Sequence, residues 1–111
     1  MHLERIEREL EAAVTALTEG NEGKARVCAR RAAGQAVAWL MSTHPLPGFG
    51  TDAMAHLTAL QRHPDFPDEV RAAAVRLTTS VRDRDVLPFS TDPLGDARII
   101  VAHVRSRLGV A

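Results

Sequence analysis

The chain has 111 residues with 14 basic and 14 acidic side chains, so its formal net charge is zero and its pI is about 7.0. The length predicts one domain over residues 1–111, and an apolar content of 45% is typical of a globular protein with an ordinary core. Proteins dedicated to nucleic-acid binding usually carry a basic excess, which this chain lacks.

The cysteine content and the N-terminal sequence both favour the cytoplasm. Cys28 is the only cysteine, which excludes an intrachain disulfide and a cysteine-based zinc site. The stretch MHLERIEREL is charged from Glu4 onward and lacks the apolar centre of a signal peptide. No stretch approaches the roughly 18 apolar residues of a membrane span. We therefore expect a soluble cytoplasmic protein, with Cys28 as a small buried filler.

The first predicted helix runs from about His2 to Thr18, because apolar residues recur there at helical spacing. Gly20 is well placed to end it in a left-handed conformation. Acidic residues dominate the face expected to be exposed. The positions that carry the apolar spacing are Leu3, Ile6, Leu10, Ala13, Val14 and Leu17.

The second predicted helix runs from about Glu22 to Met41, with Asn21 as its N-cap. Its apolar stripe consists mostly of alanines, which let neighbouring helices approach closely. We expect this helix at the centre of a bundle, antiparallel to the first helix because the connection is short. The stripe is Ala25, Ala29, Ala32, Ala33, Ala36, Val37 and Leu40.

The loop at 43–51, THPLPGFGT, contains two prolines and two glycines. A short third helix is predicted from about Asp52 to Arg62, with Thr51 as its cap. Its inward-facing positions are expected at Met54, Leu57 and Leu60.

The fourth predicted helix has Pro67 in its first turn and ends near Ser80 to Arg82. The acids at 68 and 69 suit the positive end of its dipole. Its buried face is expected at Val70, Ala73, Ala74, Leu77 and Val81.

The last predicted helix is capped by Asp92, carries Pro93 at its first position and ends at Gly109. Its stripe is Ala97, Ile100, Val101, Val104 and Leu108. No alternating pattern typical of a strand occurs in the sequence. The fold class expected is therefore all-α, an up-and-down bundle of four to five helices.

Four cations cluster in the first half of the second predicted helix and are candidates for anion binding. Two interpretations remain open for them. They bind a phosphate, or they have no ligand and either pair with the acidic face of the first helix, the simplest use of both sets of charges, or are solvated. The four residues are Lys24, Arg26, Arg30 and Arg31.

The histidines show no spacing typical of a metal site, and no nucleophile elbow or glycine-rich phosphate loop occurs. We therefore expect no metal and no cofactor. The histidines are His2, His44, His56, His63 and His103.

Two segments carry a resemblance to a known family. A first amphipathic helix with a glycine turn is followed by EGNEGKARVCARRAAGQAV, and the last helix reads GDARIIVAHVRSRL. This layout resembles the HEPN-like bundles, which include substrate-binding partners of minimal nucleotidyltransferases and a set of RNases. The resemblance implies a non-catalytic binding or interaction module rather than an enzyme. It would act as a homodimer or with a separately encoded protein partner, and a nucleotide or RNA stays open as its ligand.

The alternative that the resemblance implies is an RNase. HEPN RNases carry an Arg followed a few residues later by a His, and Arg98 is followed by Ile-Ile-Val-Ala and His103. Five residues along a regular helix turn by about 500°, which leaves the two side chains about 140° apart. They would converge on one phosphate only in a distorted helix or across a dimer.

Self-association is expected on separate grounds. A small bundle of unequal helices often leaves one apolar stripe uncovered. The expected members of such a stripe are Trp39, Met41 and Ile99.

Overall fold

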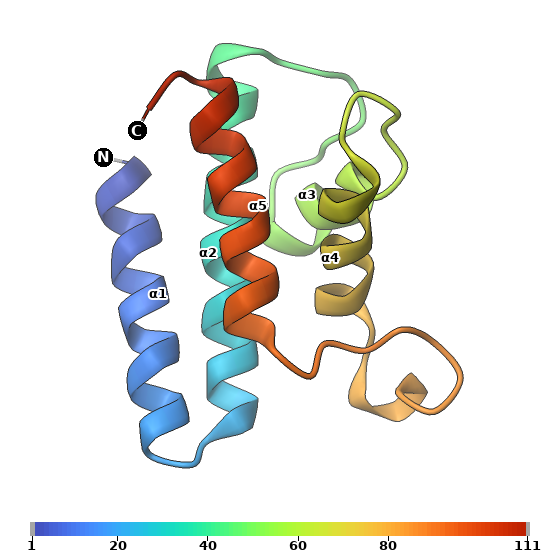
Figure 1. The fold of residues 1–111 in the computed structure, drawn as a ribbon. Helices are drawn as coiled ribbons and strands as arrows, with labels where there is room; N and C mark the ends of the chain where they lie inside the picture. The colour runs from blue at the N-terminus through green and yellow to red at the C-terminus, as the bar shows by residue number, and fades with distance from the viewer. Residues whose placement is uncertain (1, 111) are drawn as a thin grey trace.

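The computed structural model describes residues 2–110, and within them the chain forms five α-helices, one short 3₁₀ helix and no strand (Figure 1). This confirms an all-α helical bundle. Among the described residues, none of the helices is both long enough and apolar enough to cross a membrane. The elements are α1 (His2–Thr18), α2 (Glu22–Thr43), α3 (Ala53–Leu60), α4 (Asp68–Thr78), η1 (Val81–Asp83) and α5 (Pro93–Arg107).

Helix α2 is the centre of the bundle, as its alanine content predicts. It packs against all four of the other α-helices. Figure 1 shows α1 running antiparallel to α2, with α5 beside both of them. Helices α3 and α4 lie on the side of α2 and α5 that faces away from α1. All seven residues of the predicted stripe are buried, and small side chains at these positions let the neighbouring backbones come close.

The predicted end of α1 and the predicted N-caps of α2 and α5 are confirmed, whereas α2 continues to Thr43, two residues beyond its predicted end at Met41. Gly20 has a φ of +76°, a left-handed conformation that favours glycine after a helix. The Asn21 side chain accepts a hydrogen bond of 3.1 Å from the backbone N–H of Lys24. At the start of α5, Asp92 Oδ1 accepts a hydrogen bond of 3.0 Å from the backbone N–H of Gly95, and Pro93 occupies the first helical position.

The predicted cap of α3 is wrong by one residue. Asp52 is the N-cap, and its Oδ1 accepts a hydrogen bond of 2.8 Å from the backbone N–H of Ala55. Thr51 lies outside the helix and is exposed. A carboxylate at this position also interacts favourably with the positive end of the helix dipole, which a hydroxyl does less well.

Helix α4 begins later and ends earlier than predicted. Pro67 is at the N-cap rather than in the first turn, and the helix ends at Thr78 because Thr79 is extended with a ψ of 129°. Val81 therefore lies in η1 instead of on the buried face of α4, and its side chain is 51% exposed.

Three apolar residues that were expected to face inward are exposed: Val14, Leu17 and Met54. The fully buried strip of α1 is narrow and consists of Ile6, Ala13 and Ala16. Because α1 packs chiefly on α2 and only slightly on α5, its flanking residues are left at the surface. Trp39, Met41 and Ile99 were expected to form an uncovered apolar stripe. Instead, all three are half-buried against the core. Cys28 is buried beside Ala13 and Leu94, which confirms it as a filler.

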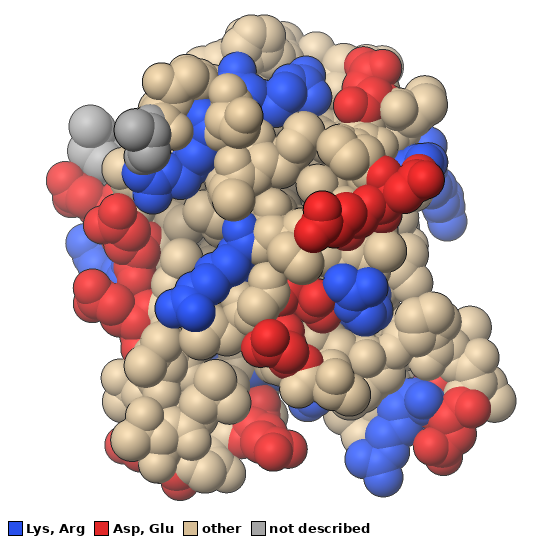
Figure 2. Space-filling model, in the orientation of Figure 1, with Lys and Arg blue, Asp and Glu red and all other residues tan. Residues whose placement is uncertain are grey.

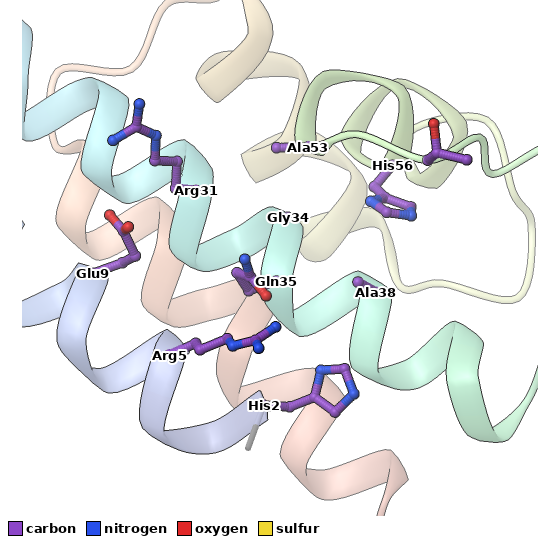
Figure 3. A pocket seen from close by; sticks show the side chains of 10 residues that line it. His2, Arg5, Glu9, Arg31, Gly34, Gln35, Ala38, Ala53 and His56 are labelled. Carbon is purple, nitrogen blue, oxygen red and sulfur yellow. The ribbon is translucent and has the colours of Figure 1, made fainter.

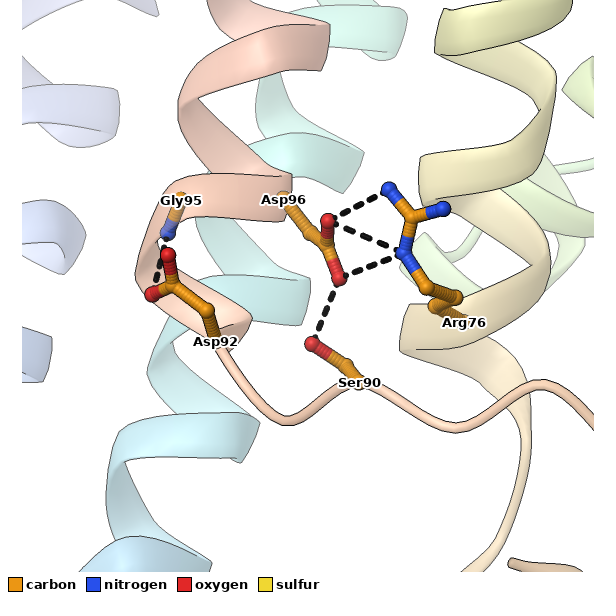
Figure 4. Close-up of polar contacts among 5 residues, drawn as sticks. All are labelled: Arg76, Ser90, Asp92, Gly95 and Asp96. Atoms are coloured by element: carbon orange, nitrogen blue, oxygen red, sulfur yellow. Dashed lines mark hydrogen bonds and ion pairs between the residues drawn. The ribbon is translucent and has the colours of Figure 1, made fainter.

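A buried carboxylate joins α4, α5 and the segment before α5 (Figure 4). Asp96 accepts a hydrogen bond of 2.7 Å from Nη2 of Arg76 and two of 3.1 Å from its Nε. It also accepts one of 2.6 Å from the hydroxyl of Ser90. The hydrogen bond and charge of Asp96 raise the pKa of Arg76 despite its partial burial. These contacts fix α5 against α4 in one position.

Candidate functional site

The structure separates the four cations that were candidates for anion binding. The Arg26 guanidinium lies 4.4 Å from the centroid of the Phe89 ring and donates a hydrogen bond of 3.4 Å to the carbonyl of Ser90. Lys24 is exposed at the start of α2. Arg30 is half-buried, and burial together with the nearby charge of Arg26 lowers its pKa. Arg31 borders a hollow of about 500 Å³, and Arg26 borders a smaller one of about 280 Å³.

The alternative use of these cations, pairing with the acids of α1, is not seen either. Within residues 2–110 the ion pairs are Arg76–Asp96, Asp68–Arg71 and His63–Asp65. None of them joins α1 to α2. The complementary charge of the two helices therefore acts at longer range and contributes little in water.

The hollow that Arg31 borders is a cleft of about 500 Å³ between α1, α2 and the start of α3. We call it the α1–α2–α3 cleft. Figure 3 shows Arg5 reaching from α1 toward Gln35 of α2 with His2 close by, and Arg31 with Glu9 farther along. Its volume is typical of a small-molecule site. The lining residues are His2, Arg5, Glu9, Arg31, Gly34, Gln35, Ala38, Thr51, Ala53 and His56.

Helical spacing explains why α1 supplies charged residues here. His2, Arg5 and Glu9 are three and four residues apart, so they lie on one flank of the helix. On α2, Arg31, Gln35 and Ala38 follow the same rule. The cleft thus arises where two polar flanks meet beside the narrow buried strip of α1.

Gly34 brings α3 into contact with α2 at this cleft. A Cβ atom added to Gly34 would lie 2.5 Å from the Cβ of Ala53 and 2.7 Å from its Cα, closer than packed carbons tolerate. Only glycine at this position allows the first turn of α3 to sit on α2. This close approach places His56 at the edge of the cleft.

The cleft contains charge that the protein does not neutralise. Neither Arg5 nor Arg31 forms an ion pair or a side-chain hydrogen bond with another described residue, and the same holds for Glu9. Two guanidinium groups and one carboxylate leave a net positive charge. A guanidinium offers parallel N–H donors that match the oxygens of a carboxylate or a phosphate.

Two histidines also line the cleft. Burial lowers the pKa of His56, and the carboxylate of Asp52 opposes this only in part, so the ring is neutral at pH 7. The His2 ring stacks on Trp39 with a centroid separation of 6.1 Å, and its Nδ1 is buried without a hydrogen-bond partner in the described structure. His56 therefore brings a neutral hydrogen-bonding ring to the edge of the cleft, whereas the buried Nδ1 of His2 is not accessible to a ligand.

Sequence reasoning missed most of this cleft. Of the charged residues that line the cleft, only Arg31 was a candidate for anion binding from the sequence. The signal that was present is the spacing of His2, Arg5 and Glu9 along one flank of α1. It could not be interpreted without knowing that α3 folds back over α2 at Gly34.

Arg98 and His103, the candidate RNase pair, border a different hollow of about 500 Å³ between α4 and α5. Helix α5 is continuous from Pro93 to Arg107, so the helix provides no distortion that would bring the two side chains together. The His103 ring packs edge-on against Phe66 with centroids 5.6 Å apart, and its Nε2 is buried without a partner in the described part of the chain. Burial and the charge of Arg107 lower the pKa of His103.

Among residues 2–110, no group of three or more His, Cys, Asp or Glu side chains is arranged to hold a metal ion. Comparisons of the chain with protein-family models, with curated proteins and with solved structures give no match. The HEPN-like resemblance thus stays a prediction from the sequence.

Proposed function

We propose that this protein is a non-catalytic binding module that takes a small anionic molecule in the α1–α2–α3 cleft. The observation that carries the proposal is the pair of unneutralised guanidinium groups, Arg5 and Arg31, in one hollow of about 500 Å³. The ligand class is a small molecule that presents a phosphate or a carboxylate group to these side chains.

The other groups of the cleft fit this class of ligand. Gln35 and the neutral ring of His56 supply hydrogen bonds without adding charge. Glu9 would accept from a hydroxyl or an amine on the same molecule, which favours a ligand with both an anionic group and a donor. A nucleotide has both features, in agreement with the resemblance to nucleotidyltransferase partners. Within this proposal the protein works in the cytoplasm, as a homodimer or with a separately encoded partner such as a nucleotidyltransferase.

The test is a titration followed by the backbone amide signals in two-dimensional NMR, with inorganic phosphate, a nucleoside monophosphate and citrate as separate probes. We expect saturable shifts that centre on the cleft residues. The variants Arg5→Gln and Arg31→Gln should each weaken binding about tenfold, because a hydrogen bond to a charged group is worth about 1.5–3 kcal/mol.

Arg82→Gln is the matched control, since Arg82 is an exposed arginine in η1 and does not border the cleft. It should leave the titration unchanged. Shifts that do not saturate, or that are spread evenly over the exposed arginines, would contradict the proposal. A preference among the three probes would separate phosphate from carboxylate as the recognised group.

A second candidate function is RNA cleavage by Arg98 and His103. It is favoured by the fact that both border one hollow and that His103, with its lowered pKa, is a neutral base at pH 7. Because α5 is continuous, a second copy would have to complete the site. RNA cleavage that is lost in both Arg98→Ala and His103→Ala would favour this function over the binding module.

A further inference from the structure

A second hollow lies on the opposite flank of α1 from the cleft, in the groove between α1 and α5. We call it the α1–α5 groove; its volume is about 680 Å³. Helices α1 and α5 each pack mainly on α2 and only slightly on each other, which leaves the groove open. Leu10, Val101, Ala102 and Val110 form its apolar surface, and Arg98 and Arg105 are its charged members.

The two sides of this groove carry opposite charge. Leu10 lines the groove from α1, and helical spacing places Glu7 and Val14, three residues before and four residues after it, on the same side of the helix. Glu11 follows Glu7 by one turn. Glu7 and Glu11 are exposed and form no ion pair with another described residue. Arg98, on the α5 side, is likewise exposed and unpaired within residues 2–110. Figure 2 shows acidic side chains along the edge of this face where α1 lies. Toward α5 the surface is mostly uncharged and carries arginine or lysine side chains.

A surface with an acidic half and a basic half complements a second copy of itself. In a dimer with a two-fold axis, the same patch is used by both subunits, so the acidic half of each can meet the basic half of the other. We infer that the protein forms a symmetric dimer through the α1–α5 groove, in which α1 of each subunit packs on α5 of the other. The inference rests on the proposed function in one respect, because it specifies the surface of the homodimer that is part of that proposal.

The directions of α1 and α5 allow each to pack antiparallel on its counterpart in the second copy. Helices α1 and α5 run in opposite directions (Figure 1). A two-fold axis parallel to the groove preserves the height of every residue along it. Leu10 borders the same groove as Arg98 and Val101, so α1 of the second copy arrives with Glu7 and Glu11 near Arg98. All neighbouring helices in the resulting four-helix layer are antiparallel, the usual geometry of a bundle.

Two further observations fit a helix as the occupant of the groove. Ala102 is exposed at the middle of α5, and its small side chain lets another helix come close. Val14 is 42% exposed on α1, although it is a large apolar residue of an otherwise well-packed helix. Packing against a second copy would cover Val14, whose burial adds apolar area to the interface.

The test is the molar mass in solution, measured by sedimentation velocity and by light scattering at concentrations up to about 1 mM, the range of weak association. We expect twice the chain mass of 12.1 kDa. Ala102→Glu should shift the protein to the monomer, because it places a bulky charged side chain in the interface. Ala72→Glu is the matched control, an exposed alanine on α4, and should leave the dimer intact.

A charge exchange tests the predicted pairing directly. Arg98→Glu and Glu7→Arg should each weaken the dimer by tenfold or more, whereas the double variant should recover most of the affinity. Far-UV circular dichroism shows whether each variant keeps its helices. A monomer at every concentration would overturn the inference and leave the groove to a different partner. A dimer that is insensitive to Ala102→Glu, or a double variant without recovery, would overturn it as well.

The same variants separate this inference from the proposed function. The cleft lies on the other flank of α1, so a monomeric Ala102→Glu variant should still bind phosphate if the cleft is the ligand site. A wild-type protein that binds phosphate but stays monomeric would contradict the dimer and leave the binding module standing. A protein that forms the dimer but binds no anion would contradict the binding module alone.

Discussion

The α1–α2–α3 cleft and the α1–α5 groove lie on the two flanks of one helix, and their surfaces differ in chemistry. On one flank, α1 contributes His2, Arg5 and Glu9, while on the other it contributes Leu10. Both hollows exist because the buried strip of α1 is narrow and its partner α2 presents mostly alanine. A helix that packs through small residues leaves both flanks accessible, and the residue types on each flank then decide what kind of partner it fits.

The helices that line the two hollows can be disrupted separately. The largest loss in the free energy of unfolding is expected for α5, which lines the groove. Asp96→Ala removes the carboxylate that joins α5 to Arg76 and Ser90. It leaves a partly buried guanidinium without its partner. We expect a loss of about 3 kcal/mol in the free energy of unfolding, the lower end for a buried ion pair because the Arg76 side chain is 33% exposed. Urea unfolding followed by circular dichroism measures it.

Asp68→Ala is the control for this loss. It breaks the pair between Asp68 and Arg71 on the surface of α4, where the Asp68 side chain is 95% exposed. Surface pairs of this kind contribute about 0–1 kcal/mol. Equal losses for the two variants would contradict the view that the Asp96 contacts fix α5. In the Asp96 variant the amide signals of α5 should shift more than those of the cleft.

The wall of the cleft is tested by Gly34→Ala. Alanine favours a helix over glycine by about 1 kcal/mol, but overpacking against Ala53 costs about 1–3 kcal/mol. We expect a net loss of about 1 kcal/mol and weaker phosphate binding, since α3 must move away from α2. The dimer mass should be unchanged.

Gly23→Ala provides the same substitution in open surroundings. The nearest atom to an added Cβ at Gly23 is Oδ1 of Asn21 at 3.9 Å, so only the helix propensity changes. This variant should be slightly stabilised. Stabilisation of both variants in urea unfolding would show that Gly34 is not required for the approach of α3.

The pH dependence of stability distinguishes the cleft from the exposed surface. Burial holds the pKa of His56 in the folded state below the unfolded value of about 6.5. The unfolded state therefore binds more protons below that pH, and the free energy of unfolding decreases as the pH falls from about 6.5 toward the folded pKa. Above about 6.5 the histidine should have no effect. His103 has a lowered pKa for the same reason and contributes in the same direction.

His56→Asn should reduce this acid-induced loss, measured as urea unfolding at about pH 7.5 and pH 5, on either side of the unfolded pKa. His44→Asn is the control, because His44 is exposed beyond the end of α2 and borders neither hollow. An unchanged acid dependence in the His56 variant would contradict the burial that we assign to its ring.

Local features of the fold could be predicted from the sequence, because they depend on neighbouring residues. The caps at Asn21 and Asp92 and the alanine stripe of α2 follow from short-range chemistry, and the structure confirms them. The exposure of Val14 could not be predicted, because apolar spacing shows that a face is apolar but not that another helix covers it. The bonds between Arg76 and Asp96 join residues on separate helices, and nothing local to either residue signals the other.

The candidate sites were harder to predict for the same reason. The four cations at 24–31 share one segment, yet their different directions around α2 send only Arg31 to the cleft. Arg5 reaches the same cleft from another helix, and its spacing from His2 and Glu9 gains a meaning only once α3 is known to fold back over α2. A binding site made by three helices is set by their packing, so adjacency in sequence was a poor guide to it.

The smallest expected effect concerns Arg26, which the sequence grouped with the anion-binding cations. Its contacts with Phe89 and Ser90 hold the segment before α5, so its role is structural. Arg26→Ala should lower the free energy of unfolding by about 0.5–1 kcal/mol, the size of an exposed cation–π contact, and should leave phosphate binding in the cleft unchanged. Lys24→Ala, two residues earlier and exposed, should change neither quantity. If Arg26→Ala weakened phosphate binding as much as Arg31→Gln, the cations of α2 would act together, and the distinction between the cleft and the rest of that helix would fail.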